Sequence, residues 1–248
     1  MWNIRSVKGW GMAGGCWRIA SGLLLLPVAV GGLAGCGGGT GSSATGTSPS
    51  AAKASNGALT ATKLQGALLT RVNGVAAAGP ASSGTYASLT GASGAKQAAS
   101  AAQVTPKACA TAATMGFAPD ALASAPAAAV TFQLGTNGVS EVLIASSAKS
   151  ATTALAGQVP TECAKYEETV AGKTYTYALK EQAVTGIGEQ ARLLNVHAVS
   201  AQPSELWSVI YRGADFVGTV TVVGPNASEQ AVKELGQQAY AFAAKSLS

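Results

Sequence analysis

Short runs of alternating apolar and polar residues follow one another from residue 128 to residue 223, and short turn sequences separate several of them. A period of two places successive side chains on opposite faces of a strand. The turn sequences Thr136-Asn137-Gly138, Ala171-Gly172-Lys173 and Gly213-Ala214-Asp215 favour antiparallel neighbours, because parallel strands need a crossover of about a dozen residues. Strands are predicted at residues 128–134, 139–145, 167–170, 174–179, 191–199, 206–211 and 216–223, with a further short strand at 85–89.

The C-terminal segment, residues 227–247, has the clearest helical pattern of the chain. Asn226 is its predicted N-cap, with Glu229 in capping-box spacing. One face of this helix carries four apolar residues: Val232, Leu235, Ala239 and Phe242. Other helices are predicted at 62–69, 95–102, 106–115 and 150–156. A one-sided helix needs a surface to cover, so the predicted fold is α+β: a single domain with an antiparallel sheet of six or seven strands and helices packed on one face.

Residues 1–35 are predicted to be a signal peptide, with a basic head and an apolar run over 19–30. Leu33-Ala34-Gly35-Cys36 matches a bacterial lipobox, in which the cysteine receives a diacylglyceryl thioether and becomes the new N-terminus. The alternative is an ordinary secretory signal, which would leave Cys36 as a stray thiol. Because the head is long for a signal, Met12 is predicted to be the true start.

Residues 36–57 are predicted to be the lipidated cysteine and a flexible Gly/Ser/Ala tether, because this segment has too few apolar residues to form a core. Residues 58–248 remain for one extracytoplasmic domain. The predicted signal holds three basic residues and no acidic one, so the mature chain has 13 basic and 11 acidic residues and a net charge of only +2. Nucleic acid is therefore not an implied partner.

Of the four cysteines, one lies in the predicted signal and Cys36 is the predicted lipidation site, which leaves Cys109 and Cys163. In an exported chain these two are predicted to form the one disulfide. A metal site is the alternative, but the chain has a single histidine to add to it. Each of the two cysteines ends a P-x-x-C sequence, at 106–109 and 160–163, which predicts a cysteine one turn into a helical segment.

Taken together, these features resemble actinobacterial lipoproteins related to the extracellular sensor domain of the mycobacterial kinase PknH. The resemblance rests on the lipobox, the low-complexity tether, the P-x-x-C sequences, the antiparallel run with a terminal helix, and the sequence Gly186-Ile187-Gly188-Glu189-Gln190-Ala191 before the sixth strand. It covers residues 58–248 and implies an extracytoplasmic ligand-sensing or binding domain.

Aromatic and basic residues on the predicted strands are the candidate ligand-facing positions. Tyr175 and Tyr177 share one face of a strand, and Trp207 and Tyr211 share one face of another. If the two faces coincide, these side chains line an apolar pocket. The alternative is that this surface packs under the terminal helix. The candidate partners for an anionic group are two arginines near strands, which solvation would explain equally well: Arg192 and Arg212.

No sequence pattern indicates catalysis. Residues 186–191 superficially match a dinucleotide fingerprint, but a strand-like pattern follows where that motif needs a helix, so a turn is predicted. His197 invites a serine triad with Asp120 or Asp215, yet the chain has no G-x-S-x-G sequence. His197 is therefore predicted to be a surface or cleft-edge residue.

The predicted protein is a lipid-anchored, non-catalytic binding or sensor module on the outer face of the cytoplasmic membrane. It would bind an unknown small molecule or envelope component and use no cofactor or metal. Two alternatives remain open: a carrier of lipids or glycolipids, and an envelope structural or interaction protein.

Overall fold

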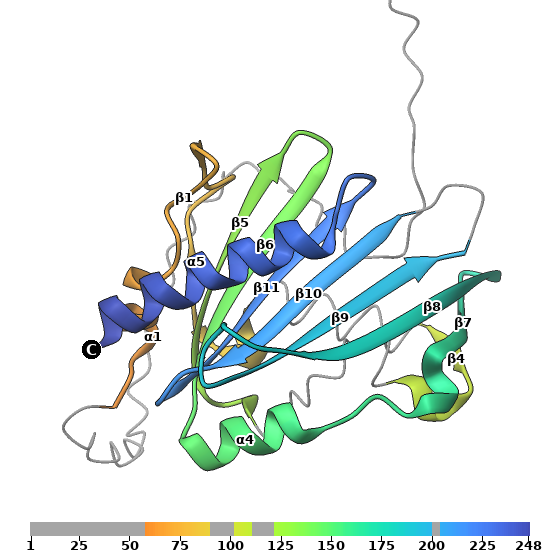
Figure 1. Ribbon diagram of the computed structural model, residues 1–248, viewed down its shortest axis with the longest axis horizontal. Coiled ribbons are helices and arrows are strands. Elements are labelled where there is room, and N and C mark those ends of the chain that lie inside the picture. The colour runs from red at the N-terminus through yellow and green to blue at the C-terminus, as the bar shows by residue number, and fades with distance from the viewer. Residues whose placement is uncertain (1–57, 90–101, 111–121, 200–203) are drawn as a thin grey trace, which may run out of the picture.

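The computed structural model describes residues 58–89, 102–110, 122–199 and 204–248, and it contains a nine-stranded sheet in which every pair of neighbours is antiparallel (Figure 1). In spatial order its strands are β3 (Ser82–Thr85), β5 (Pro126–Leu134), β6 (Asn137–Ala145), β11 (Phe216–Gly224), β10 (Glu205–Arg212), β9 (Gln190–Ala198), β8 (Lys173–Val184), β7 (Lys165–Val170) and β4 (Gln103–Thr105). A separate hairpin joins β1 (Arg71–Val72) to β2 (Val75–Ala76). The predicted sheet-rich single domain is confirmed, but six or seven strands was too few.

The two short edge strands account for the wrong strand count. The sequence of β3 is SSGT and that of β4 is QVT, so neither shows the apolar alternation that identifies a strand. The strand predicted at 85–89 is also wrong, because residues 86–88 form the 3-10 helix η1 (Tyr86–Ser88) after β3 ends. Short polar edge strands are typical of natural sheets, since they discourage pairing with other chains.

All three predicted hairpins form, although two of the turns differ in position. Leu134 pairs with Asn137, so the β5–β6 turn is Gly135-Thr136, with Gly135 at φ +61°, and not Asn137-Gly138. The β7–β8 turn has only two residues, Ala171 and Gly172, and both have positive φ, as a type I′ turn requires. The β10–β11 connection is the predicted 213–215.

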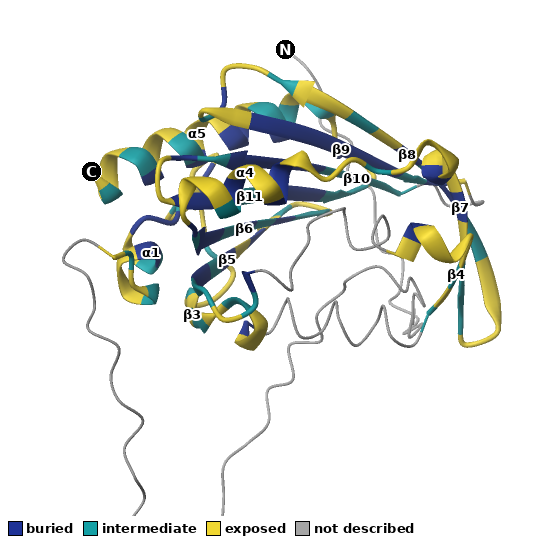
Figure 2. Ribbon diagram, turned by 90° about the horizontal axis from the view of Figure 1, so that it is seen from below, coloured by how far each residue is buried: buried dark blue, intermediate teal, exposed yellow. Residues whose placement is uncertain are grey.

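Helices cover both faces of the sheet, and the prediction that they pack on one face is wrong. On the face that we call the α5 face, α1 (Ala61–Gly66) and α5 (Glu229–Leu247) pack over a cluster that includes Leu143, Leu193 and Val209. On the opposite face, the α4 face, α4 (Ala148–Ala156) packs over the neighbours of those residues, among them Leu194 and Ile210. Figure 2 shows the sheet with its central strands buried between these layers.

The terminal helix α5 begins two residues later than predicted. Ser228 is its N-cap, and the Ser228 side chain accepts a hydrogen bond from the Ala231 N–H at 3.2 Å, so the predicted cap Asn226 lies outside the helix. The predicted apolar face is correct except at Phe242, which is 37% exposed. Ala243 is buried there instead. The helix predicted at 62–69 is the shorter α1, and the one predicted at 150–156 starts two residues earlier, as α4.

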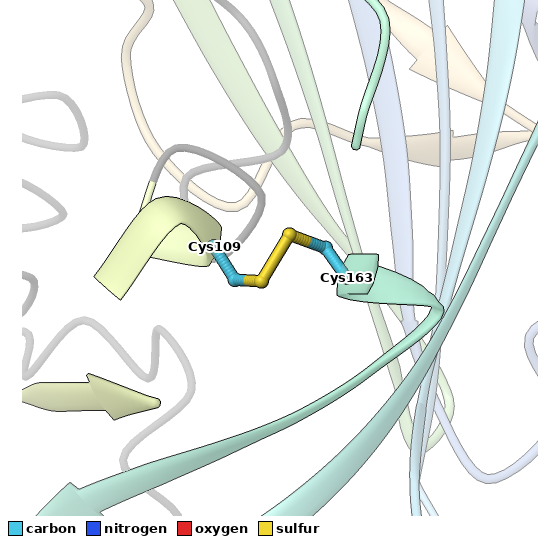
Figure 3. Close-up of a disulfide and its surroundings, with 2 residues drawn as sticks. All are labelled: Cys109 and Cys163. Atoms are coloured by element: carbon cyan, nitrogen blue, oxygen red, sulfur yellow. A yellow bond between two sulfur atoms is a disulfide. The ribbon is translucent and has the colours of Figure 1, made fainter. Parts of the chain in front are cut away.

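The predicted disulfide joins Cys109 to Cys163, with 5.4 Å between their Cα atoms (Figure 3). Both cysteines lie in short 3-10 helices, η2 (Lys107–Cys109) and η4 (Thr161–Ala164), each preceded by its proline as the N-cap. Both are fully buried, in a third cluster on the α4 face beneath strands β7 to β9. The disulfide therefore attaches the two P-x-x-C turns to the core.

Several predictions fall on residues outside the described ranges: the signal peptide, the lipobox with Cys36, the tether, the helix at 95–102, most of that at 106–115, and Asp120. Within the described residues, no helix is both long and apolar enough to span a bilayer.

Candidate functional site

A groove of about 530 Å³ lies on the α4 face, between the segment that joins α4 to η4 and the strands β8 and β9. Its apolar lining includes Leu155, Val159, Pro160 and Leu179, and its polar lining includes Gln158, Thr161, Glu181, Gln182, Gln190 and Arg192. The volume is in the range typical of small-molecule sites, which is about 300–1,000 Å³. The side chain of Gln182 lies on the α5 face, where it donates to Glu229 Oε1 of α5 at 2.9 Å. The groove therefore combines apolar walls with the amide side chains of Gln158 and Gln190 and one charge pair.

Glu181 on β8 contacts both sides of the groove. Its Oε1 is 2.8 Å from Arg192 Nη1 on β9, and its Oε2 accepts a hydrogen bond from the Val159 N–H, also at 2.8 Å. The side chains of Glu181 and Arg192 are 16% and 7% exposed. One carboxylate thus connects two strands to the segment before η4 and neutralises the arginine at the floor of the groove.

The predicted aromatic surface does not exist as one surface. Tyr177 pairs with Ala198 of β9, whereas Trp207 pairs with Asn195 of the same strand. Ala198 and Asn195 are three residues apart, so their side chains lie on opposite faces of β9. Tyr177 and its alternate neighbour Tyr175 consequently lie on the α4 face. Trp207 and Tyr211 lie on the α5 face.

Each half of this aromatic set contributes to a core. Tyr177 stacks on Tyr166, with 5.3 Å between ring centroids, in the cluster that contains the disulfide. Tyr211 is fully buried and makes an edge contact with Tyr240 of α5, at a centroid distance of 5.9 Å. Trp207 is half-buried against the cluster on the α5 face, which also contains Tyr211. The alternative reading, packing under the terminal helix, therefore describes Trp207 and Tyr211.

The two predicted arginines lie in different places. Arg192 lies in the groove, in its ion pair with Glu181. Arg212 is the last residue of β10, where its Nη1 is 2.7 Å from Glu189 Oε2, and the side chain of Glu189 is 44% exposed. Arg212 therefore does not contribute to the groove.

His197 is a half-exposed residue on the α5 face, as predicted for a surface position. Its Nδ1 is 2.6 Å from Glu205 Oε1, while Asn195 donates to Glu205 Oε2, also at 2.6 Å. Among the described residues, no three His, Cys, Asp or Glu side chains converge on a common metal position. Asp215 lies in the β10–β11 turn, which follows the last residue of β10, whereas Glu205, the partner of His197, is the first residue of that strand. Asp215 therefore does not form a triad with His197.

The sequence at 186–191 is a turn that leads into β9, as predicted. Gly186 and Gly188 have φ of +82° and +63°, and a Cβ at Gly188 would overlap the carbonyl oxygen of Arg212. Ile187 between them is buried under α5. Two left-handed glycines and a close backbone approach explain this sequence without a nucleotide.

Arg192 is among the residues predicted from the sequence to face a ligand, whereas Glu181 and the glutamines of the groove are not. Glu181 lies beyond residue 179, where the strand was predicted to end, whereas β8 continues to Val184. In the longer strand Glu181 shares a face with Tyr177 and Leu179, and a lone acid on an apolar face is a signal that could have found it.

No protein-family model matches the chain, and no curated protein matches it. Among solved structures, the extracellular domain of PknH from Mycobacterium tuberculosis is similar, with a TM-score of 0.53 and 16% sequence identity over 76% of this chain and 97% of that chain. A putative uncharacterized protein from Mycobacterium smegmatis, the Rv0999 ortholog, aligns with a TM-score of 0.35 and 14% identity over 57% of this chain and 76% of that chain. The resemblance predicted from the sequence is confirmed as one of fold: the described domain is similar to the PknH extracellular domain.

Proposed function

We propose that this chain is an exported, lipid-anchored protein whose domain binds a small, uncharged polar ligand in the groove on the α4 face, without catalysis. The groove carries the proposal, because it is a concave site of suitable size with polar side chains on apolar walls. Its arginine is already neutralised by Glu181, which disfavours a strongly charged ligand. Amide side chains both donate and accept hydrogen bonds, which favours a ligand that carries amides or hydroxyls.

Three observations support the extracytoplasmic location. The sequence around Cys36 is that of a lipobox. A buried disulfide between Cys109 and Cys163 is the chemistry of exported proteins. The fold is also similar to that of a kinase extracellular domain. Two acyl chains on Cys36 would suffice for stable attachment, since a single chain binds a membrane only marginally.

The carrier alternative requires an acyl-sized hollow between the sheet and its helices. Under α5, a Cβ added to Gly236 would lie 2.6 Å from Val209 Cγ1, so the helix and the sheet are in close contact there. This packing favours a superficial groove for a small ligand over a lipid tunnel beneath α5.

The anchoring part is tested with the full gene in an actinobacterial host. The Cys36→Ala variant should move from the membrane fraction to the medium, and metabolic labelling with palmitate should mark the wild type alone. A Cys36→Ala variant that stays in the membrane fraction would contradict the lipid anchor.

The binding part is tested on the secreted Cys36→Ala protein by native and denaturing mass spectrometry. A bound ligand should appear as an extra mass that is released on denaturation. Adding Ala183→Trp, which fills the groove, should abolish that mass. The matched control is Ala178→Trp, on the opposite face of the same strand, which should retain it. Loss of the mass in both variants, or in neither, would place the ligand elsewhere.

A further inference from the structure

Glu141 is a fully buried carboxyl in the cluster on the α5 face, next to α1. It lies on β6, with Val130 of β5 as its cross-strand partner on one side and Val220 of β11 on the other. An ionised carboxylate in such a place is costly unless donors or a cation compensate it.

Few polar groups compensate the burial of the Glu141 carboxyl group. The N–H of Leu69, just after α1, donates to its Oε2 at 2.8 Å, while its Oε1 has no hydrogen-bond partner among the described residues. The hydroxyl of Tyr211 is likewise buried and without a hydrogen-bond partner in the described part of the chain. Burial raises the pKa of Glu141 to about 7, and the Leu69 N–H opposes that rise.

No cation faces Glu141 from the described elements packed against it. Strands β5 and β11 contain no titratable side chain. Lys63 of α1 is exposed, and the exposed Arg71 beyond it donates to the carbonyl of Gly74. The titratable neighbour is Tyr211 of β10, and burial together with the charge of Glu141 raises the pKa of Tyr211 well above its usual range. Tyr211 thus stays neutral while Glu141 titrates.

We propose that Glu141 is a pH-dependent latch for the segment 59–72, which contains α1. When the carboxyl is neutral, it accepts the Leu69 hydrogen bond without a buried charge, and the segment stays on the sheet. When the carboxyl ionises, opening of the segment admits water to it, so ionisation favours the open form. The segment directly follows residues 36–57, the predicted tether, so its opening would lengthen the flexible connection to the membrane.

The latch shifts a minor population and does not release the segment completely. Leu64, Ala67, Leu68 and Val72 are all buried in the cluster, and they hold the segment down at every pH. The coupling is limited by the difference between a pKa of about 7 in the closed form and the ordinary value of 4.5 in the open one. Ionisation therefore raises the opening equilibrium constant by at most about 300-fold.

The test is hydrogen exchange of the full chain between pH 5 and pH 9, corrected for intrinsic rates, in wild type and Glu141→Gln. The amides of Leu64, Ala67 and Leu68 should lose protection by at least about tenfold over this range in the wild type. Their protection should stay constant in Glu141→Gln, which keeps the acceptor and removes the charge. Amides in β9 and β10 should remain more protected than those of α1 at every pH in both proteins, because the central strands exchange through global unfolding.

Two results would overturn the latch: equal pH dependence in both proteins, or amides of α1 that are protected as strongly as those of β9 and β10 at every pH. The second result would mean that α1 opens only when the whole domain unfolds. A second measurement does not depend on the variant. The carboxyl carbon of Glu141 in wild-type protein, followed by NMR, should titrate near pH 7, and titration below pH 5 would also overturn it.

Discussion

Glu141 and Glu181 are both largely withdrawn from water, and their surroundings treat the charge differently. Glu181 has an arginine and a backbone N–H within 2.8 Å. Glu141 has one backbone N–H and an oxygen with no hydrogen-bond partner among the described residues. Coulombic pairing compensates the desolvation of the first carboxylate, whereas the second remains cheapest when protonated. Replacing Glu141 should therefore change how the stability depends on pH, whereas replacing Glu181 should lower the stability at neutral pH.

Replacing Glu141 with Gln should remove a pH dependence of global stability. The folded-state pKa of about 7 exceeds the ordinary value of 4.5, so the native state binds more protons than the unfolded state between these values. The resulting stability is present below pH 4.5 and is lost as the pH rises through 7, by about 3 kcal/mol in total. Urea unfolding at pH 5 and pH 9 measures this loss. The exposed-site control Glu167→Gln should keep the wild-type difference, and a Glu141→Gln protein that keeps it too would contradict the assignment.

Replacing Glu181 with Ala should destabilise the protein at neutral pH by about 2 kcal/mol, because Arg192 loses its carboxylate and the Val159 N–H loses its acceptor. Glu181→Gln should be milder, since an amide oxygen can still accept from Val159. The surface control Glu167→Ala should lie within about 0.5 kcal/mol of wild type. Equal effects of Glu181→Ala and the control would show that the ion pair contributes nothing measurable.

At the scale of elements, α5 is fixed where it crosses β10. Gly236 sits against Val209, and a Cβ there would be 2.6 Å from Val209 Cγ1 and 3.4 Å from Ile187 Cδ1. Gly236→Ala should gain up to about 1 kcal/mol of helix propensity but lose more to overpacking, for a net loss of about 1 kcal/mol. Gly66 in α1 has open space around it, so Gly66→Ala should be neutral or stabilising. Denaturant midpoints of both variants test this, and a stabilised Gly236→Ala protein would mean that the helix can shift.

The β5–β6 hairpin illustrates what local sequence could and could not predict. Its existence followed from two apolar alternations around turn residues, but Gly135 and Gly138 both offered a plausible turn. The choice of Gly135 pairs Leu134 with Asn137, and long-range pairing of β6 with β11 completes that register. A one-residue shift in register would move Glu141 and Leu143 to the other face of the sheet. The register therefore depends on contacts between residues far apart in the sequence.

The groove shows the same limit for the candidate site. Arg192 was visible as a charge on a strand, but its meaning depended on Glu181, which is 11 positions earlier and becomes its neighbour through the pairing of β8 with β9. The segment that carries Val159 reaches this pair only after the chain has left α4. A site that is formed by three separate segments therefore cannot be predicted from the sequence of any one of them.

At the scale of the whole molecule, adjacent apolar residues decide how the sheet is covered. Leu193-Leu194 and Val209-Ile210 place buried side chains on both faces of the central strands. Two consecutive buried apolar residues are typical of strands that are covered on both faces, whereas strict alternation of apolar and polar residues indicates a strand that is covered on one face. The terminal helix could cover only one face, so a second layer had to come from elsewhere, and α4 and the disulfide region supply it on the α4 face.

The disulfide should stabilise the whole sheet, because the loop it closes contains two of the nine strands and the helix α4. Cys109 and Cys163 are 54 positions apart, and β5, β6 and α4 lie between them, while both cysteines return to the edge near β7 and β4. Closing a loop of this length removes unfolded-state entropy worth about 4 kcal/mol in the chain-entropy model. The Cys109→Ala/Cys163→Ala double variant should lose about that much in urea unfolding. Reductant should lower wild-type stability towards that of the variant and leave the variant unchanged; a variant as stable as the oxidised wild type would show that native packing, and not the crosslink, keeps the two turns in place.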